Sequence, residues 1–128
     1  MVLITKDSIS HFHRLSSDEG WHFYMGDPLR LLLQISSSGT LKEIIMGQNN
    51  IIQREVEEGK QQHQQQQHLQ HVVPAGDWFA STSFGEYSFV GCTVAPGFEF
   101  IDFEMGKKKE LQREFPKHVK TLEKFCLD

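Results

Sequence analysis

The sequence predicts an all-β fold, a sandwich or barrel, with a short helical segment near its C-terminal end. Turn signals built from Gly, Pro, Asn, Asp and Ser divide the chain at short intervals, and the runs between them are apolar or alternating. A helical period appears only between residues 107 and 126. A length of 128 residues fits one domain, so residues 1–128 are expected to form a single unit with one core.

Eight strands are expected, separated by short turns. The clearest is Leu29–Ile35, where every second residue is Leu or Ile, so these side chains share one face while Arg30 and Gln34 share the other. Inside the last strand, Gly91 indicates a bulge or the close approach of another backbone or a ligand. In chain order the strands are Val2–Thr5, Ile9–Leu15, Gly20–Met25, Leu29–Ile35, Leu41–Met46, Leu69–Val73, Trp78–Ser81 and Tyr87–Val94.

Turn signals and one low-complexity segment mark the boundaries between these strands. Asp27-Pro28 separates the third strand from the fourth, and Ser36 to Gly39 separates the fourth from the fifth. Pro74 to Gly76 separates the sixth from the seventh. Residues 61–68 are rich in Gln and His, a composition that buries too little apolar surface to offset its ordering entropy, so they are expected to form a surface loop.

The last segment, residues 107–126, has the period of a helix. Pro116 cannot donate a backbone hydrogen bond inside this run, so two short helices or one break are expected there. The basic run Lys107 to Lys109 is interpreted as the solvated start of the segment. Spacings of four, four, three and four residues place one apolar stripe along it: Leu111, Phe115, Val119, Leu122 and Cys126.

Charge and composition exclude several classes of partner. The chain carries 13 Lys and Arg against 17 Asp and Glu, a net charge of -4, so no nucleic-acid partner is expected. The first apolar run, Met1 to Thr5, is too short for a signal peptide or a membrane span, so a cytoplasmic protein without membrane association is expected. Cys92 and Cys126 are interpreted as reduced core residues.

Two histidines lie one residue apart in the second expected strand. His11 and His13 should share one face while Phe12 points to the other, which lets two imidazoles share one metal or one ligand. Asp18 or Glu19 could supply a carboxylate beside them. The register of the next strand leaves two alternatives: an inward Glu19 brings Trp21 and Phe23 with it, and an inward Asp18 brings His22 and Tyr24.

Three blocks of the sequence resemble the cupin superfamily. Its first motif, G-x5-H-x-H-x(3,4)-E-x6-G, is similar to His11-Phe12-His13, Glu19 and Gly26, with five residues instead of three or four between His13 and Glu19. Pro74-Ala75-Gly76 resembles the centre of the second motif. The similarity is closer to a small uncharacterised cupin subfamily, whose members read much like HFHRLSSDEGWHFYMGDPL, VVPAGDWFAS and FVGCTVAPGFEFIDFE, blocks that cover most of the chain from Ile9 to Pro116.

Four departures from the cupin pattern limit what the resemblance implies. Phe79 stands where the second motif has a histidine, and Ser83 stands where it has an asparagine. The glycine expected before His11 falls at Thr5, and Gly59 is separated from Pro74 by the Gln-rich insert. Members of the subfamily usually carry a further N-terminal segment, so this chain is expected to begin inside the fold.

The resemblance implies a cupin-type jelly-roll barrel, a double-stranded β-helix, and three hypotheses for its function. The preferred hypothesis is a small ligand, sugar-like or nucleotide-like, bound in the barrel without chemistry, because the Phe79 position has lost its histidine. The second is a divalent metal, Zn, Mn, Fe or Ni, on His11, His13 and Glu19. The third resembles the sugar-nucleotide epimerases, with His11 or His13 as base and Glu19 or Asp18 as its orienter.

Aromatic and polar residues near the two motifs are expected to line the ligand pocket. Aromatic rings would stack on a sugar or another planar ligand. A homodimer is also expected, because small barrels of this kind commonly pair through edge strands. The expected lining residues are Trp21, His22, Phe23, Arg30, Trp78 and Phe79.

Overall fold

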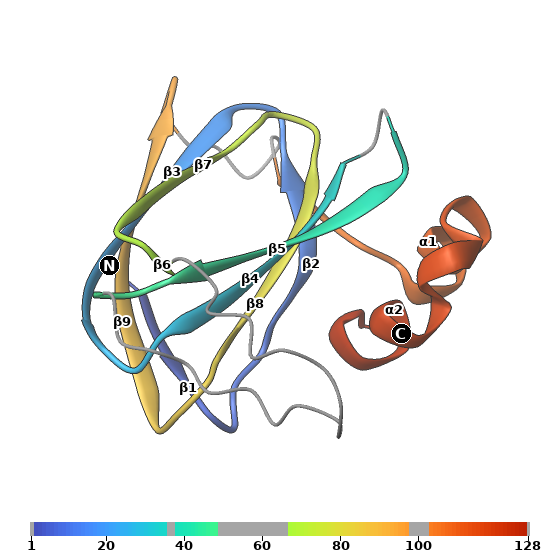
Figure 1. Cartoon of the computed structure of the whole chain (residues 1–128). Helices are drawn as coiled ribbons and strands as arrows, with labels where there is room; N and C mark the ends of the chain where they lie inside the picture. Colours follow the sequence, from blue (N-terminus) through green and yellow to red (C-terminus); the bar gives the residue numbers. More distant parts are fainter. Residues whose placement is uncertain (1, 36–37, 49–66, 98–102, 128) are drawn as a thin grey trace.

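The computed structural model describes residues 2–35, 38–48, 67–97 and 103–127, without the side chains of residues 32–35. Their strands form two facing sheets, a jelly-roll sandwich with helices beside it (Figure 1). Residues 61–66 of the predicted Gln/His-rich loop lie outside the described residues. Among the described helices, none is long and apolar enough to cross a membrane.

Four strands form the smaller sheet, in the order β1-β9-β3-β7. All of its pairs are antiparallel. Between Phe23 and Met25 the pairing of β3 with β9 shifts by one residue. Tyr24 lies at this shift, and a Cβ atom added to Gly91 would meet its hydroxyl oxygen at 2.5 Å, so the group that approaches Gly91 is a side chain rather than the backbone or ligand that the sequence predicts. The strands are β1 (Val2–Thr5), β3 (Asp18–Gly26), β7 (Gln70–Val73) and β9 (Tyr87–Ala95).

Six strands form the larger sheet, in the order β10-β2-β8-β4-β5-β6. Its pairs are antiparallel except for β5 with β6, where Ile45 and Gln67 are partners in a short parallel pair. The buried Gln67 therefore belongs to a strand, although the sequence predicts a loop as far as residue 68. The strands are β2 (Ser10–Leu15), β4 (Leu29–Ile35), β5 (Thr40–Met46), β6 (Gln67–His68), β8 (Trp78–Ser83) and β10 (Phe103–Met105).

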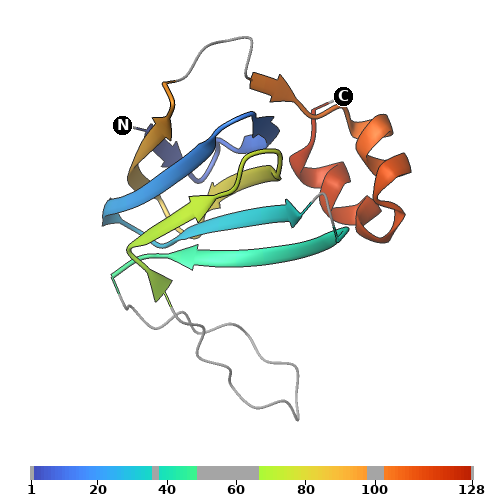
Figure 2. The same cartoon turned by 90° about the horizontal axis from the view of Figure 1, so that it is seen from above.

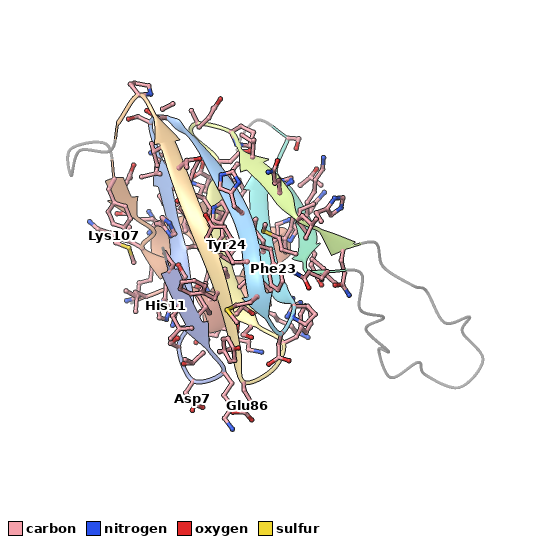
Figure 3. All side chains as sticks on the ribbon, turned by 90° about the vertical axis from the view of Figure 1, so that its left-hand side faces the viewer. Asp7, His11, Phe23, Tyr24, Glu86 and Lys107 are labelled. Carbon is pink, nitrogen blue, oxygen red and sulfur yellow. The ribbon has the colours of Figure 1, made fainter. Side chains whose placement is uncertain are left out.

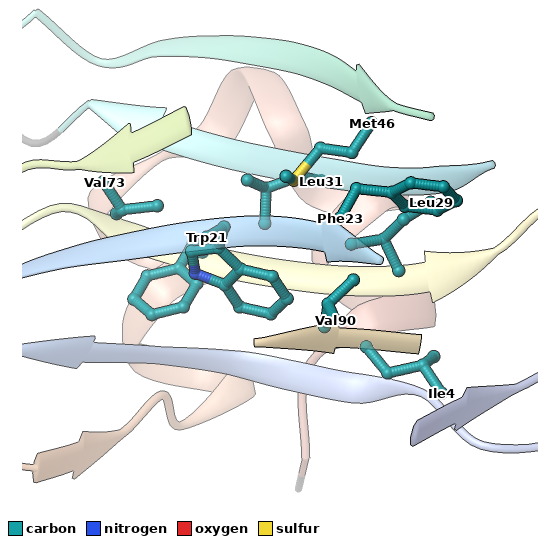
Figure 4. Close-up of a cluster of buried hydrophobic side chains, with 9 residues drawn as sticks. Ile4, Trp21, Phe23, Leu29, Leu31, Met46, Val73 and Val90 are labelled. Atoms are coloured by element: carbon teal, nitrogen blue, oxygen red, sulfur yellow. The ribbon is translucent and has the colours of Figure 1, made fainter. Parts of the chain in front are cut away.

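The main core fills the space between the two sheets. Every second residue of each strand points inward, so both sheets contribute large apolar side chains to one cluster (Figure 4). The alternation predicted for β4 is confirmed at Leu29 and Leu31, which are fully buried here. The cluster consists of Ile4, Trp21, Phe23, Leu29, Leu31, Met46, Val73, Phe79 and Val90.

The C-terminal helical segment covers the outer face of the larger sheet (Figure 2). It consists of α1 (Lys108–Glu114), a 3-10 turn (Pro116–His118) and α2 (Val119–Phe125), which confirms the predicted break at Pro116. Val119 is 43% exposed and lies outside the predicted apolar stripe, because the 3-10 turn changes the helical phase. The second cluster consists of Phe12, Trp78, Ala80, Leu111, Phe115, Leu122, Phe125 and Cys126.

Backbone pairing joins the two ends of this helical segment. Lys107 forms a parallel bridge with Leu127, and the backbone N–H of Lys108 donates to the carbonyl oxygen of Leu127 at 3.1 Å. The thiol of Cys126 donates to the carbonyl oxygen of Gly106 at 3.3 Å. Cys92 and Cys126 are both free cysteines, as the sequence predicts.

Candidate functional site

The inward face of β3 carries Glu19, Trp21 and Phe23. All three side chains are buried, whereas Asp18 is exposed and His22 is half-buried. Glu19 faces Val73 on one neighbouring strand and Val94 on the other. Of the two registers that the sequence leaves open, the structure has the one with Glu19 inward.

Glu19 is a buried carboxyl group with an unpaired oxygen. The residue is 8% exposed, and its Oε2 has no hydrogen-bonding partner among the described residues. Burial raises the pKa of this carboxyl, while weaker interactions with the side chains of Cys92 and Trp21 lower it in part. The indole Nε1 of Trp21 is also buried and has no acceptor of normal geometry in the described part of the chain. A buried donor and a buried acceptor group therefore lie two residues apart on one strand.

Cys92 lies on β9 directly opposite Trp21 and contacts the same carboxyl group. Burial raises the pKa of its thiol to about 12, and the nearby Glu19 carboxylate acts in the same direction. Cys92 is therefore a neutral thiol near pH 7. A group of this kind donates a weak hydrogen bond, and it is not an activated nucleophile.

His13 lies on β2 of the larger sheet, opposite Phe79 in register. Its Nδ1 lies 2.7 Å from the backbone carbonyl oxygen of His11. A carbonyl oxygen only accepts, so Nδ1 carries the proton and Nε2 keeps the lone pair when the ring is neutral. Burial lowers the pKa of His13, and the hydrogen bond to His11 opposes this in part. The sequence predicts Glu19 or Asp18 as the orienter of this ring, whereas in the structure the carbonyl of His11 has that role.

Phe79 lies where the cupin pattern has its third imidazole, and its phenyl ring contacts His13. The two ring centroids are 4.1 Å apart at an interplanar angle of 54°. The rings of Phe79 and Trp21 form a T-shaped pair, with centroids 6.0 Å apart and an interplanar angle of 90°. On the other side of His13 lies Phe103 of β10, at 5.3 Å. Two phenyl rings thus pack against His13.

The donor set does not fit the metal centre that the cupin motif implies. No group of three or more His, Cys, Asp or Glu side chains is arranged to hold a metal ion in the part of the chain that the structure describes. The Nδ1 of His13 is engaged with a backbone carbonyl, and a phenyl ring occupies the third histidine position. His11 contributes its carbonyl oxygen to this site.

Three of the residues predicted to line the pocket do not face the interior between the sheets. His22 points outward, where its Nε2 lies 3.1 Å from the hydroxyl oxygen of Thr93. Arg30 donates to Glu43 at 3.3 Å and lies 5.8 Å from the ring of Phe125, on the helix side of the larger sheet. Trp78 also faces the helices. β4 and β8 pack against the main core on one face and against the helices on the other, so period two alone does not identify their interior face.

Sequence reasoning missed several polar residues on the interior side. Ser81 is 1% exposed, its Oγ has no hydrogen-bond partner in the described part of the chain, and it shares the inward face of β8 with Phe79. His71 shares the inward face of β7 with Val73 and lies opposite Trp21 in register. Burial lowers the pKa of His71, as do His68 and Lys42. The alternation of residues within β7 and β8 predicts that His71 and Ser81 face inward, once Val73 and Phe79 are placed on the inward face.

Comparison with known proteins relates this arrangement to one family. The sequence model of the family described as "Cupin superfamily (DUF985)" matches residues 1–106, which include every described strand. A solved protein from Shewanella oneidensis is similar at 31% identity with a TM-score of 0.80, over 98% of this chain and 71% of that chain. A hypothetical protein from Leishmania major is similar at 30% identity with a TM-score of 0.79, over 98% of this chain and 73% of that chain. No match was found among curated proteins.

Proposed function

The chain belongs to the cupin superfamily, in the family described as DUF985, and we propose that it binds a small molecule between its two sheets. The observation that carries this proposal is a pair of buried polar atoms on β3, Oε2 of Glu19 and Nε1 of Trp21, neither of which has a hydrogen bond of normal geometry among the described residues. Leaving such an atom without a partner costs about 1–3 kcal/mol. A ligand with hydrogen-bonding groups would recover that free energy for both atoms.

The surroundings of this pair favour a ligand with a polar edge and an apolar face. Phe79 and His13 present rings from the larger sheet, and Phe103 continues the aromatic surface. Rings of this kind stack on sugars and on planar heterocycles, while the few polar groups fix the ligand's orientation. A sugar-like or nucleoside-like compound meets both requirements.

A second candidate function is proton transfer by His13. The hydrogen bond from Nδ1 to the carbonyl of His11 leaves the lone pair of Nε2 free to accept a proton. Because burial lowers its pKa, the ring is neutral near pH 7 and therefore ready to act as a base. Glu19, with its raised pKa, would supply the complementary acid. An isomerase-like reaction on the bound ligand would use these two groups.

Native mass spectrometry of the untagged protein tests ligand binding directly. A small molecule retained by the wild type should be lost or reduced in Glu19→Gln and in Trp21→Phe. Asp18→Asn is a matched control, since this neighbouring carboxyl faces outward and accepts a hydrogen bond from Ala75 at 2.8 Å, as an amide oxygen also can. Trp78→Phe is the control for the indole, because its Nε1 also has no hydrogen-bond partner among the described residues but lies on the helix side. Equal retention in all four variants would contradict the proposal.

Measuring turnover of the retained compound tests whether the protein is an enzyme or only binds this compound. If the protein isomerises the retained compound, His13→Gln should abolish turnover while the compound still binds. Metal analysis of the same preparation, with His11→Ala and His13→Ala as controls, tests the metal hypothesis. A stoichiometric metal that both substitutions remove would replace the metal-free proposal.

A further inference from the structure

The sandwich has one side at which the chain passes from the larger sheet to the smaller one. β6 pairs with β5 of the larger sheet, and β7 pairs with β3 of the smaller sheet. Only Leu69 separates β6 from β7, and its carbonyl oxygen accepts from the backbone N–H of Phe23 at 2.8 Å. β5 and β7 therefore converge on this side of the sandwich.

Two basic residues lie on the inward faces of these strands. Lys42 precedes Ile44 and Met46 at intervals of two residues, and both of these pack into the main core, so alternation places Lys42 on the same face of β5. His71 lies two residues before the buried Val73 on β7 and faces inward for the same reason. His71 is half-buried and Lys42 is exposed, which places the pair at the margin of the interior.

Facing rows of paired residues bring Lys42 and His71 to this margin. In the smaller sheet, His71 is the register partner of Trp21. In the larger sheet, Leu33 is the register partner of both Phe79 and Lys42. The rings of Trp21 and Phe79 meet across the interior, with their centroids 6.0 Å apart. Lys42 and His71 therefore stand at the ends of two facing rows, on the side where β5 and β7 converge.

Positive charge gathers at this margin. Burial lowers the pKa of His71, and the charges of His68 and Lys42 lower it further. Glu43 follows Lys42 in sequence but lies on the other face of β5, where it pairs with Arg30 at 3.3 Å. Within the described ranges, no carboxyl group forms an ion pair with Lys42. The described residues therefore supply this margin with basic groups and no paired acid.

The inward carboxyl group of β3 is directed toward a different strand. The register partner of Glu19 on β7 is Val73 rather than His71. Its carboxyl interacts with the thiol of Cys92 on β9, and β9 borders β3 on the side opposite β7. Glu19 therefore does not neutralise the basic margin formed by Lys42 and His71.

We propose that Lys42 and His71 bind an anionic group of the ligand, a phosphate or a carboxylate, at this margin. The ammonium group and a protonated imidazole would donate charge-assisted hydrogen bonds to its oxygens. This inference rests on the proposed binding function and adds a charge to the ligand. The rest of the ligand would contact the neighbouring rings of Trp21 and Phe79, as the sugar or base of a phosphorylated compound can.

A bound anion should reverse the electrostatic effect on His71. Lys42 repels the protonated form of the ring, whereas an anion between the two groups attracts it. Binding of the anion should therefore raise the pKa of His71. Because linkage is reciprocal, the anion should bind more tightly as the pH falls through that pKa.

Histidine ring resonances in NMR spectra of the intact chain test the inference. Inorganic phosphate and acetate are the probes, and each is compared with chloride at equal ionic strength. At least one probe should shift the His71 resonances saturably and raise the pKa of the ring. The resonances of His22, on the outer face of β3, should not move. The probe that binds more tightly identifies whether a phosphate or a carboxylate fits the margin.

Matched lysine variants separate this site from a general attraction to positive charge. Lys42→Gln should weaken binding of the probe about fivefold, which is the effect of losing one partly exposed charge pair. It should also raise the pKa of His71 in chloride, because a repelling charge is removed. Lys117→Gln removes an exposed lysine of the 3-10 turn and should change neither quantity.

Two results would overturn the inference. Equal shifts of His71 in phosphate, acetate and chloride would show that no anion binds there, and unchanged binding in Lys42→Gln would show that the lysine takes no part. Native mass spectrometry distinguishes these failures from failure of the proposed function. A small molecule that is lost in Glu19→Gln but retained equally in Lys42→Gln would uphold binding between the sheets and contradict an anionic group at the margin.

Discussion

The Nδ1 atom of His13 lies 2.7 Å from the carbonyl oxygen of His11, two residues earlier on the same strand. Cupin motifs place these two residues side by side as metal ligands, but here the backbone of one orients the ring of the other. The ring packs against the phenyl groups of Phe79 and Phe103. In this chain the His-x-His pattern therefore orients the imidazole of His13 through the backbone of His11.

The buried imidazole of His13 should make stability fall at acidic pH. Its folded pKa is lowered from 6.5, so the unfolded chain takes up a proton at a pH where the folded chain does not. The free energy of unfolding should be fully retained above pH 6.5 and decrease as the pH falls below it. His13→Gln should flatten this decrease in urea titrations between about pH 5 and about pH 8. His22→Gln, on the outer face, is the control, and an equal flattening there would contradict the prediction.

The buried carboxyl of Glu19 should have the opposite dependence on pH. Its folded pKa is raised above 4.5, so the unfolded chain loses its proton first and stability decreases as the pH rises through the folded value. In ligand-free protein, Glu19→Gln should be more stable than the wild type by about 1 kcal/mol near neutral pH. The difference should disappear toward pH 4.5. Denaturant unfolding of Glu19→Gln and Asp18→Asn measures it, and a gain that does not vary with pH would rule out carboxyl ionisation as its cause.

Restoring the third histidine should create metal affinity at a cost in stability. Phe79 is 1% exposed and contacts both His13 and Trp21, so Phe79→His buries a new polar ring. Without metal the variant should lose about 1–3 kcal/mol. Added zinc should raise the unfolding temperature of Phe79→His and leave the wild type nearly unchanged. The increase should vanish when His13→Ala is combined with it, and an equal increase in the wild type would show that the phenyl ring does not prevent binding.

The outer face of the smaller sheet, whose side chains are drawn in Figure 3, is expected to pair with a second copy of the chain. No helix covers it among the described residues, and large apolar side chains are exposed along its strands, at Leu3, Tyr24, Met25, Val72 and Tyr87. A second copy matches these apolar side chains by symmetry, because the same patch meets itself across a two-fold axis. The edge strand β1 borders the same face, where the sequence predicts pairing.

Sedimentation equilibrium tests this pairing. The wild type should be dimeric at micromolar concentration, and Met25→Lys combined with Val72→Lys should be monomeric. Val119→Lys changes an apolar residue of similar exposure on α2 and should remain dimeric. A monomeric wild type would end the prediction.

Local patterns account for most of the fold that the sequence predicts. The alternation in β4 and the turn at Pro74 to Gly76 are encoded within a few residues, and so is the break at Pro116. β10 is three residues long and is stabilised by pairing with β2, from which it is distant in sequence. No local period marks such a strand, because its partner is supplied by the tertiary fold.

The candidate site depends on which face of each strand meets which layer. Glu19, His13 and Phe79 are predicted from the cupin motifs, and the structure brings them to the same interior. Arg30 and Trp78 alternate correctly along their strands, but the helices cover that side of the sheet. Cys92 meets Glu19 only because β3 and β9 pair antiparallel, a long-range register that one strand's sequence does not contain.

The bridge between Lys107 and Leu127 has a consequence for hydrogen exchange. Because both ends of the helical segment are tied to each other, α1 and α2 should open as one cooperative unit, with similar protection at their slowest amides. Opening that unit uncovers Phe12 and Trp78 on the outer face of the larger sheet, while the interior around Glu19 stays closed. Exchange in the helices and exchange in β3 should therefore report two separate free energies.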